Sequence, residues 1–165
     1  MSNLSRKLMM GAAGAAGEKV YVEDVFSTYL YTGNGSTQTI TNDIDLAGEG
    51  GLVWAKVRNQ MYPGGLYDTE RGVLKQLRPD NDDGTNTRSG SITAFNSNGF
   101  SIGNDAFQTN GKCNTYVAWT FRKAPRFFDV VTYTGNGDGN RAIPHGLGVA
   151  PGFIESPMTE ILTEA

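Results

Sequence analysis

The sequence contains little of what several classes of protein require. Its 165 residues include one cysteine and one histidine. The single cysteine, Cys113, excludes an intrachain disulfide and a zinc cluster held by cysteines. The single histidine, His145, excludes a histidine-rich catalytic metal site. Both are therefore expected to be structural, since a redox thiol would need a partner and His145 has no acid or nucleophile at a useful spacing.

Basic charge and long apolar runs are also missing. The isoelectric point is about 5.1 and the net charge is −3, which argues against a nucleic-acid partner because phosphate binding needs a basic face. No apolar run approaches the ~20 residues that cross a membrane. Residues 5–17 have the outline of a signal peptide. Their apolar part is mostly glycine and alanine, which favours a retained segment that docks on a partner.

Glycine, by contrast, is abundant, with 22 residues, about twice the usual ~7% share. Together with frequent Thr, Ser and Asn, it is typical of short strands joined by tight turns. The alternation of β-branched and aromatic residues predicts an all-β fold, an antiparallel β-sandwich. The predicted strands cover residues 25–31, 51–58, 66–69, 73–77, 92–95, 100–102, 116–122 and 128–133.

Turns and the core can be placed from the same pattern. Asn34-Gly35 and Asn98-Gly99 are strong turn signals, and the second predicts a compact hairpin. The strand at 116–122 alternates most regularly. Its side chains Val117, Trp119 and Phe121 fall on one face and are the predicted core residues.

An internal repeat divides the chain. Residues 26–35 and 128–137 are identical at six of ten positions, at an offset of 102. A repeat usually marks a structural unit. We therefore expect a docking arm at 1–17, a sandwich at 18–125, and a truncated second unit with a tail at 126–165. Two strands near 128–134 and 149–154 cannot form a sandwich alone, so they must lie on the first unit, pair with another chain or be disordered.

Two polar groups suggest metal binding, but a plain interpretation is favoured for each. Three acidic residues precede Gly84, yet the EF-hand register fails because Pro79 and Gly90 would occupy the first and last ligand positions. A solvated acidic loop explains them. A polar turn explains the second group, whose oxygen-bearing side chains alternate. The residues concerned are Asp80, Asp82 and Asp83, and Asn136, Asp138 and Asn140. No metal and no cofactor are expected.

Other residues could serve carbohydrate chemistry. Asp24, Asp68 and Glu70 could form a glycosidase pair across a cleft, but Asp68 beside Arg71 favours a salt bridge in a turn. No catalytic residue is therefore predicted, and the chain is not expected to be an enzyme. Three aromatic residues could stack on sugars, although aromatics that alternate along strands usually form a core. These residues are Trp54, Tyr62 and Tyr67.

Several stretches resemble a family of marine bacteriophage virion proteins that carry a lectin-like domain and are described as tail-fibre or appendage proteins. The similar stretches are residues 3–14, 22–31, 45–54, 68–72, 95–100 and 116–124. Residues 143–154 look like the opening of a second such domain. The resemblance implies a lectin-like jelly roll and a place in the virion, without implying a ligand site.

The combined interpretation is a virion structural protein of the tail or fibre-attachment region that acts by protein–protein docking. Expected partners are other virion proteins, such as tail or portal-proximal subunits and a fibre, and further copies in a homo-oligomer such as a trimer. A module that binds host glycans and a capsid decoration protein are the alternatives. The residues expected to dock the arm are Leu4, Arg6, Lys7, Leu8, Met9 and Met10.

Overall fold

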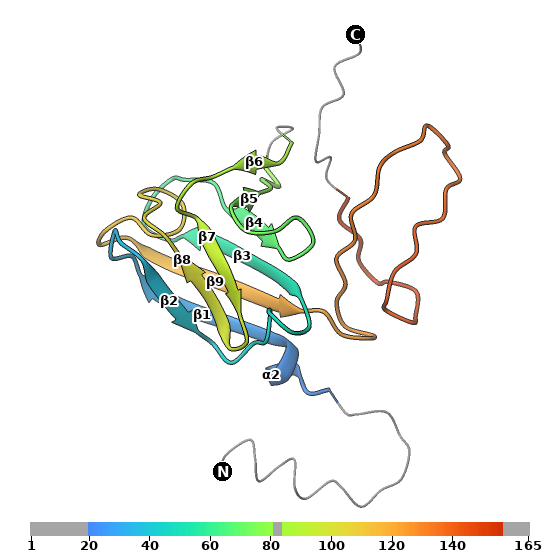
Figure 1. Ribbon diagram of the computed structural model, residues 1–165, viewed down its shortest axis with the longest axis horizontal. Coiled ribbons are helices and arrows are strands. Elements are labelled where there is room, and N and C mark those ends of the chain that lie inside the picture. Colours follow the sequence, from blue (N-terminus) through green and yellow to red (C-terminus); the bar gives the residue numbers. More distant parts are fainter. Residues whose placement is uncertain (1–19, 81–83, 157–165) are drawn as a thin grey trace, which may run out of the picture.

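The fold consists of two main antiparallel sheets that pack face to face (Figure 1). The computed structural model describes residues 20–80 and 84–156. One short helix, α2 (Val22–Val25), leads into the first strand. The predicted all-β sandwich is confirmed.

The larger sheet has four strands in the order β1-β9-β3-β4, all antiparallel. The smaller sheet has the order β2-β8-β7, and a two-stranded ribbon, β5-β6, lies beside the sandwich. The larger sheet contains β1 (Phe26–Thr32), β9 (Thr115–Arg122), β3 (Gly51–Val57) and β4 (Gly65–Asp68). The remaining strands are β2 (Gln38–Thr41), β8 (Gly99–Ile102), β7 (Ile92–Asn96), β5 (Lys75–Gln76) and β6 (Asn86–Thr87).

Both predicted turns are present. One joins two strands of the same sheet, and the other joins strands of different sheets. Asn98-Gly99 closes the β7–β8 hairpin as expected. Gly99 is required there because its φ is 145° and a Cβ would lie 2.0 Å from the carbonyl oxygen of Ile40. Asn34-Gly35 instead carries the chain from β1 in one sheet to β2 in the other. This turn therefore joins the two layers of the sandwich.

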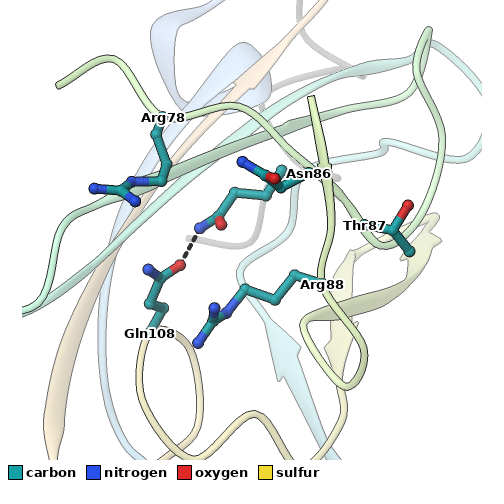
Figure 2. Close-up of a pocket in the computed structure, with 6 residues that line it drawn as sticks. Arg78, Asn86, Thr87, Arg88 and Gln108 are labelled. Carbon is teal, nitrogen blue, oxygen red and sulfur yellow. Dashed lines mark hydrogen bonds between the residues drawn. The ribbon is translucent and has the colours of Figure 1, made fainter. Parts of the chain in front are cut away.

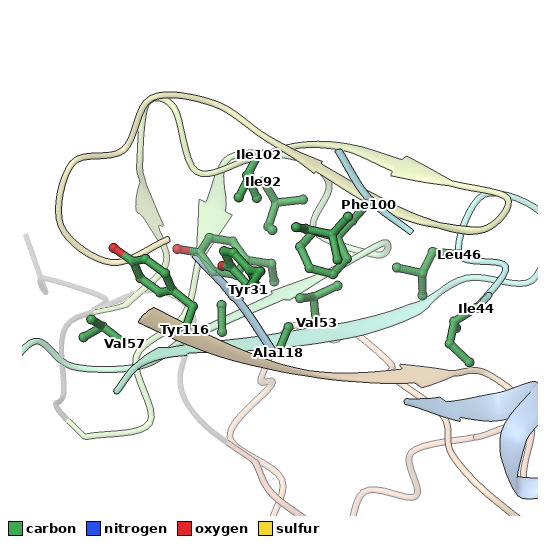
Figure 3. Close-up of a cluster of buried hydrophobic side chains, with 13 residues drawn as sticks. Tyr31, Ile44, Leu46, Val53, Val57, Ile92, Phe100, Ile102, Tyr116 and Ala118 are labelled. Atoms are coloured by element: carbon green, nitrogen blue, oxygen red, sulfur yellow. The ribbon is translucent and has the colours of Figure 1, made fainter. Parts of the chain in front are cut away.

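The core lies between the two main sheets. Figure 3 shows Ile92, Phe100 and Ile102 of the smaller sheet facing Val53 and Tyr116 of the larger one. The side chains of this cluster are buried at or below 8% exposure. They are Tyr31, Ile40, Ile44, Leu46, Val53, Ala55, Val57, Tyr67, Ile92, Phe100, Ile102, Tyr116 and Ala118.

The predicted core face of the strand at 116–122 is wrong. Tyr116, Ala118 and Thr120 point into the sandwich. Val117, Trp119 and Phe121 lie on the opposite side of the sheet, where Val117 is buried and the two aromatic rings are partly buried. The reason is that both faces of β9 are apolar enough to be buried. Hydrogen bonds make the tyrosine face suitable for the interior, because the Tyr116 hydroxyl accepts a bond from the Gly111 N–H at 2.8 Å. Such a partner removes the free-energy cost of burying a phenol hydroxyl without a hydrogen bond.

The strands predicted at 128–133 and 149–154 are also absent, since residues 129–156 contain no strand and Phe128 makes only an isolated bridge with Ala124. A strand needs a neighbour with free backbone groups. Both edges of β9, the strand just before this segment, are already paired with β1 and β3. Residues 129–156 therefore form a coil beside the end of β9 (Figure 1).

Asp129 links this coil to Gly146 and to Lys123 at the end of β9. The Asp129 carboxylate accepts the N–H of Gly146 at 2.5 Å and lies 3.3 Å from the Lys123 ammonium. Lys123 also binds Glu70 at 2.8 Å, and this bond raises the pKa of Lys123. Burial alone would raise the pKa of Asp129, but the bonds from Gly146 and Lys123 outweigh burial and hold that pKa below its usual 3.8.

The first prediction concerns the core face. Tyr116→Ala should lower the free energy of unfolding by about 3–5 kcal/mol, the usual cost of removing a buried aromatic ring. Trp119→Ala should cost clearly less, because its ring lies on the outer side of the sheet. Urea denaturation of the two variants measures both values. A larger loss for Trp119→Ala than for Tyr116→Ala would contradict this assignment of the two faces.

The second prediction concerns pH. A carboxylate whose folded pKa is lowered stabilises the structure above its unfolded pKa, and that contribution disappears as the pH falls through the folded pKa. The Asp129–Gly146 bond should therefore persist at pH 5 and be lost below 3.8. The amide shift of Gly146 in an NMR titration reports this change, and Asp129→Asn should abolish the titration. A midpoint above pH 3.8 would contradict the expected direction.

Candidate functional site

A polar pocket opens at the end of the sandwich where the β5–β6 ribbon meets the loop before β9. Its volume is about 270 Å³. Figure 2 shows the guanidinium groups of Arg78 and Arg88 near the amide of Gln108. Every lining side chain is polar. The lining residues are Gln76, Arg78, Asn86, Thr87, Arg88 and Gln108.

Asp105 fixes the position of Arg88 in this pocket. Its carboxylate accepts two bonds from the Arg88 guanidinium, at 2.9 and 3.1 Å, and it is only 5% exposed. The same carboxylate accepts the N–H of Phe107 at 3.1 Å and the hydroxyl of Thr109 at 3.3 Å. The bond from Asp105 raises the pKa of Arg88, so the guanidinium is charged at all ordinary pH values.

The floor of the pocket is neutral. Gln76 is 1% exposed and donates its amide N–H to the Tyr67 hydroxyl at 3.0 Å and to the side-chain oxygen of Gln108. Burial raises the pKa of Tyr67, so its phenol stays protonated. Gly65 leaves room for this contact, because a Cβ there would lie 2.4 Å from the Gln76 amide nitrogen. The site thus combines a neutral amide floor with a guanidinium held in place by Asp105.

This chemistry suits polar ligands. Amides donate and accept hydrogen bonds in one plane, as sugar hydroxyl pairs require, and guanidinium groups bind carboxylates in a fork. No pattern in the sequence points to this site, because Gln76, Arg88 and Gln108 come from three separate segments and none belongs to a known spacing motif. The one sequence feature that could have indicated the pocket is the polarity of residues 79–91.

A second feature is the outer face of the larger sheet, defined here by Leu30, Trp54, Val117 and Trp119. Leu30 pairs with Val117, and Trp54 pairs with Trp119 across neighbouring strands. The two indole rings lie 5.3 Å apart at 59°. Leu30 is 57% exposed and Trp54 is 37% exposed. The sheet therefore presents an apolar patch on the side opposite the core, in which Leu30 and Trp54 are exposed, Trp119 is partly buried and Val117 is buried.

The carboxylates considered for glycosidase chemistry are bound to other groups. Asp68 is 1% exposed and accepts the Arg71 backbone N–H at 2.8 Å and its side-chain Nε at 2.6 Å. The predicted turn salt bridge is therefore confirmed. Glu70 binds Lys123 instead, and Asp24 accepts the N–H of Tyr21 at 3.3 Å. These three residues do not come together in the polar pocket.

The aromatic residues considered for sugar stacking have separate surroundings. Tyr67 is a core residue with 0% exposure. Tyr62 packs edge-on against Phe107 with ring centroids 5.5 Å apart. Trp54 alone of the three lies on the outer face. The structure therefore does not bring these rings together as one platform.

The second group considered for metal binding, at residues 136–140, is explained by a turn. Asn136 accepts the N–H of Asp138 at 3.1 Å, and Asp138 accepts the N–H of Asn140 at 3.0 Å. Across residues 20–80 and 84–156, no cluster of three or more His, Cys, Asp or Glu could hold a metal ion. Asp82 and Asp83 lie outside the described residues, as do the expected docking residues Leu4, Arg6, Lys7, Leu8, Met9 and Met10.

The two rare residues lie at the surface. Cys113 is exposed and donates its backbone N–H to the Gly33 carbonyl at 3.0 Å. The His145 Nδ1 accepts the N–H of Leu147 at 3.3 Å within an exposed turn. In the part of the chain that the structure describes, no helix is long and apolar enough to cross a membrane.

Comparison with known families decides the chain's membership. Residues 22–160 match a family described as a domain of unknown function, DUF7483. The chain belongs to this family. The match spans the sandwich and the coil that follows it, including both copies of the internal repeat. No curated protein and no solved structure matches the chain.

The third prediction tests the framework of the pocket. Asp105→Ala should lower the free energy of unfolding by about 3 kcal/mol, because it leaves a guanidinium and several buried N–H and O–H donors without their acceptor. Asp80→Ala is the matched control: Asp80 is 50% exposed and binds Arg78 at 3.3 Å, so its loss should cost about 0.5 kcal/mol or less. Equal losses in urea denaturation would contradict the framework role of Asp105.

Proposed function

We propose that the chain is a non-enzymatic structural subunit of a bacteriophage virion, located in the tail or fibre-attachment region, that acts by docking on other virion proteins. The observation that carries this proposal is the apolar outer face of the larger sheet. The resemblance of six sequence stretches to virion appendage proteins supports the location.

The composition of the outer face favours a protein partner. Leu30, Trp54, Val117 and Trp119 are contiguous, because each pair is adjacent across strands. Contiguous apolar surface on a soluble domain marks an interaction site more often than scattered single residues do. Tryptophan is also enriched at the centres of protein interfaces. Burying these rings against another subunit would provide a driving force for assembly.

The coil at 126–156 adds further apolar surface. Large side chains along it are between 40% and 81% exposed. A chain segment that presents this many apolar groups and has no strand of its own gains stability when a partner covers it. The side chains concerned are Val131, Tyr133, Val149, Phe153 and Ile154.

Catalysis receives no support from the carboxylates. Asp68, Glu70 and Asp105 each bind an arginine or lysine side chain. These carboxylates serve as acceptors in ion pairs, whereas general acid catalysis needs a carboxyl that is free to donate its proton. We therefore propose a structural role for the chain.

A second candidate function is the binding of host glycans, and the polar pocket favours it. Arg88 and Gln108 offer a guanidinium and an amide beside each other, and Gln76 supplies a buried amide below them. An acidic sugar, with a carboxylate and neighbouring hydroxyls, matches these groups chemically. In this function the outer face would anchor the subunit and the pocket would face the host.

The fourth prediction places the protein in particles. Mass spectrometry of density-purified virions of the encoding phage should detect the chain as a particle component. Leu30→Lys and Trp54→Lys should each reduce its incorporation at least tenfold, because a charge on the outer face would have to be desolvated against the partner. Val73→Lys is the matched control, since Val73 is 41% exposed and lies between β4 and β5, outside the strands of the larger sheet.

Two outcomes would contradict the proposal. The first is a protein found abundantly in infected cells but absent from purified particles. The second is normal incorporation of Leu30→Lys and Trp54→Lys, which would exclude the outer face as the docking surface. Binding of the wild-type protein to host glycans that Arg88→Gln eliminates, without any presence in particles, would favour the second candidate.

A further inference from the structure

The two copies of the internal repeat differ in their surroundings. Residues 26–35 form β1 and the turn after it, whereas residues 128–137 lie in the coil. Six positions are identical between the copies and four differ. The first copy shows what each shared residue does, so it can be used to interpret the second.

The shared aromatic residues of the first copy contact β9. The Phe26 ring lies 5.0 Å from the ring of Phe121. Tyr31 stacks on Tyr116 with ring centroids 5.1 Å apart and donates its hydroxyl to the Thr109 carbonyl at 2.8 Å. The side chains at these two shared positions therefore contact β9 and the loop before it.

The shared turn residues contact the same loop. The Gly33 N–H donates to the Asn114 carbonyl at 2.8 Å, and a Cβ on Gly33 would lie 2.2 Å from the Gly111 carbonyl oxygen. The Asn34 N–H donates to the side-chain oxygen of Asn110 at 2.9 Å. Glycine at this position is thus required by close approach to a partner, and not by the turn itself.

The four positions that differ lie together in the middle of β1. They are residues 27–30 in β1, and all of them are exposed or partly exposed. The repeat has therefore kept Phe26, Tyr31 and the turn residues that contact β9 and its loop, and has changed four exposed or partly exposed positions between them. A shared strand propensity alone would not explain why these six positions are identical and the other four differ.

The second copy adopts the turn without the partner. Gly137 has a φ of 77°, close to the 73° of Gly35. The Asn136 side chain accepts the N–H of Asp138 at 3.1 Å, as Asn34 accepts the N–H of Ser36 at 2.8 Å. Yet Tyr133 is 51% exposed, and no atom of residues 20–80 or 84–156 lies within 4 Å of a Cβ placed on Gly135.

We propose that residues 128–137 are a second β1-type segment, and that their partner is a β9-type strand with its preceding loop in another domain of this family. Tyr133 would stack on the inward tyrosine of that strand, and Gly135 would approach the glycine carbonyl of its loop. The backbone of residues 128–134 would gain the strand pairing that it lacks in the coil. This contact does not depend on the virion role and can be tested separately.

The first test transplants the second copy into the first. Ser27→Asp, Thr28→Val, Tyr29→Val and Leu30→Thr in the full chain make residues 26–35 identical to residues 128–137. If both segments fit a β9-type surface, the variant should keep a cooperative thermal transition within about 5 °C of wild type, since only surface positions change. Loss of the folded state would overturn the proposal.

A matched control places the same incoming residues at shared positions. Phe26→Asp, Tyr31→Val, Thr32→Val and Asn34→Thr introduce one Asp, two Val and one Thr into the same segment, with Tyr133→Ala added so that the second copy cannot replace the first. This chain should show no cooperative transition. A transition as stable as that of the transplant would show that the shared residues carry no information and would overturn the proposal.

Restoring Tyr133 in the control is the second test. The place of β1 on β9 is then open, and residues 128–137 of a neighbouring molecule or of the same chain can occupy it. Phe128 already lies 5.4 Å from Phe121, the ring that Phe26 contacts. We expect the cooperative transition to return, with a Tm that rises with protein concentration for a neighbour and stays constant for the same chain. No return at concentrations up to about 1 mM would overturn the proposal.

Discussion

The pairing of β9 on both of its edges is the constraint on which the rest of the structure depends. β1 occupies one edge and β3 the other, each over seven residue pairs. This arrangement brings the start and the end of the sandwich together, since β1 and β9 are about 90 residues apart in the sequence. It also pairs the backbone groups of β9 on both sides, so the segment that leaves β9 at Arg122 cannot pair with β9 itself.

Hydrogen bonding decides which face of this central strand is buried. Trp119 is more apolar than Tyr116, and hydrophobicity alone would bury the tryptophan. The interior instead contains Tyr31, Tyr67 and Tyr116, whose hydroxyls meet Thr109, Gln76 and Gly111. A buried aromatic ring with a satisfied hydroxyl contributes its full apolar area without a desolvation cost. The tryptophans are left on the outer face, where they are available to a partner.

Local features of the fold could be predicted from the sequence, and features that depend on distant neighbours could not. The β7–β8 hairpin follows from Asn98-Gly99 and its flanking residues, which are all within ten positions. The face of β9 depends on Gly111 and Thr109 lying above it, which no periodicity in residues 116–122 encodes. The polar pocket is harder still to predict from the sequence. Gln76, Arg88 and Gln108 meet only after β5, β6 and the loop before β9 have packed.

The internal repeat shows this division within a single motif. The turn at Asn136-Gly137 forms without the loop that Asn34-Gly35 contacts, because a side-chain oxygen and a glycine with positive φ are sufficient to define it. The strand at 128–133 does not form, although its sequence alternates as β1 does, because strand structure is shared between two segments and only one is at hand. The same ten-residue pattern thus gives a turn in both copies and a strand in one. Strand propensity in this chain describes compatibility with a neighbour, and the neighbour decides whether the strand exists.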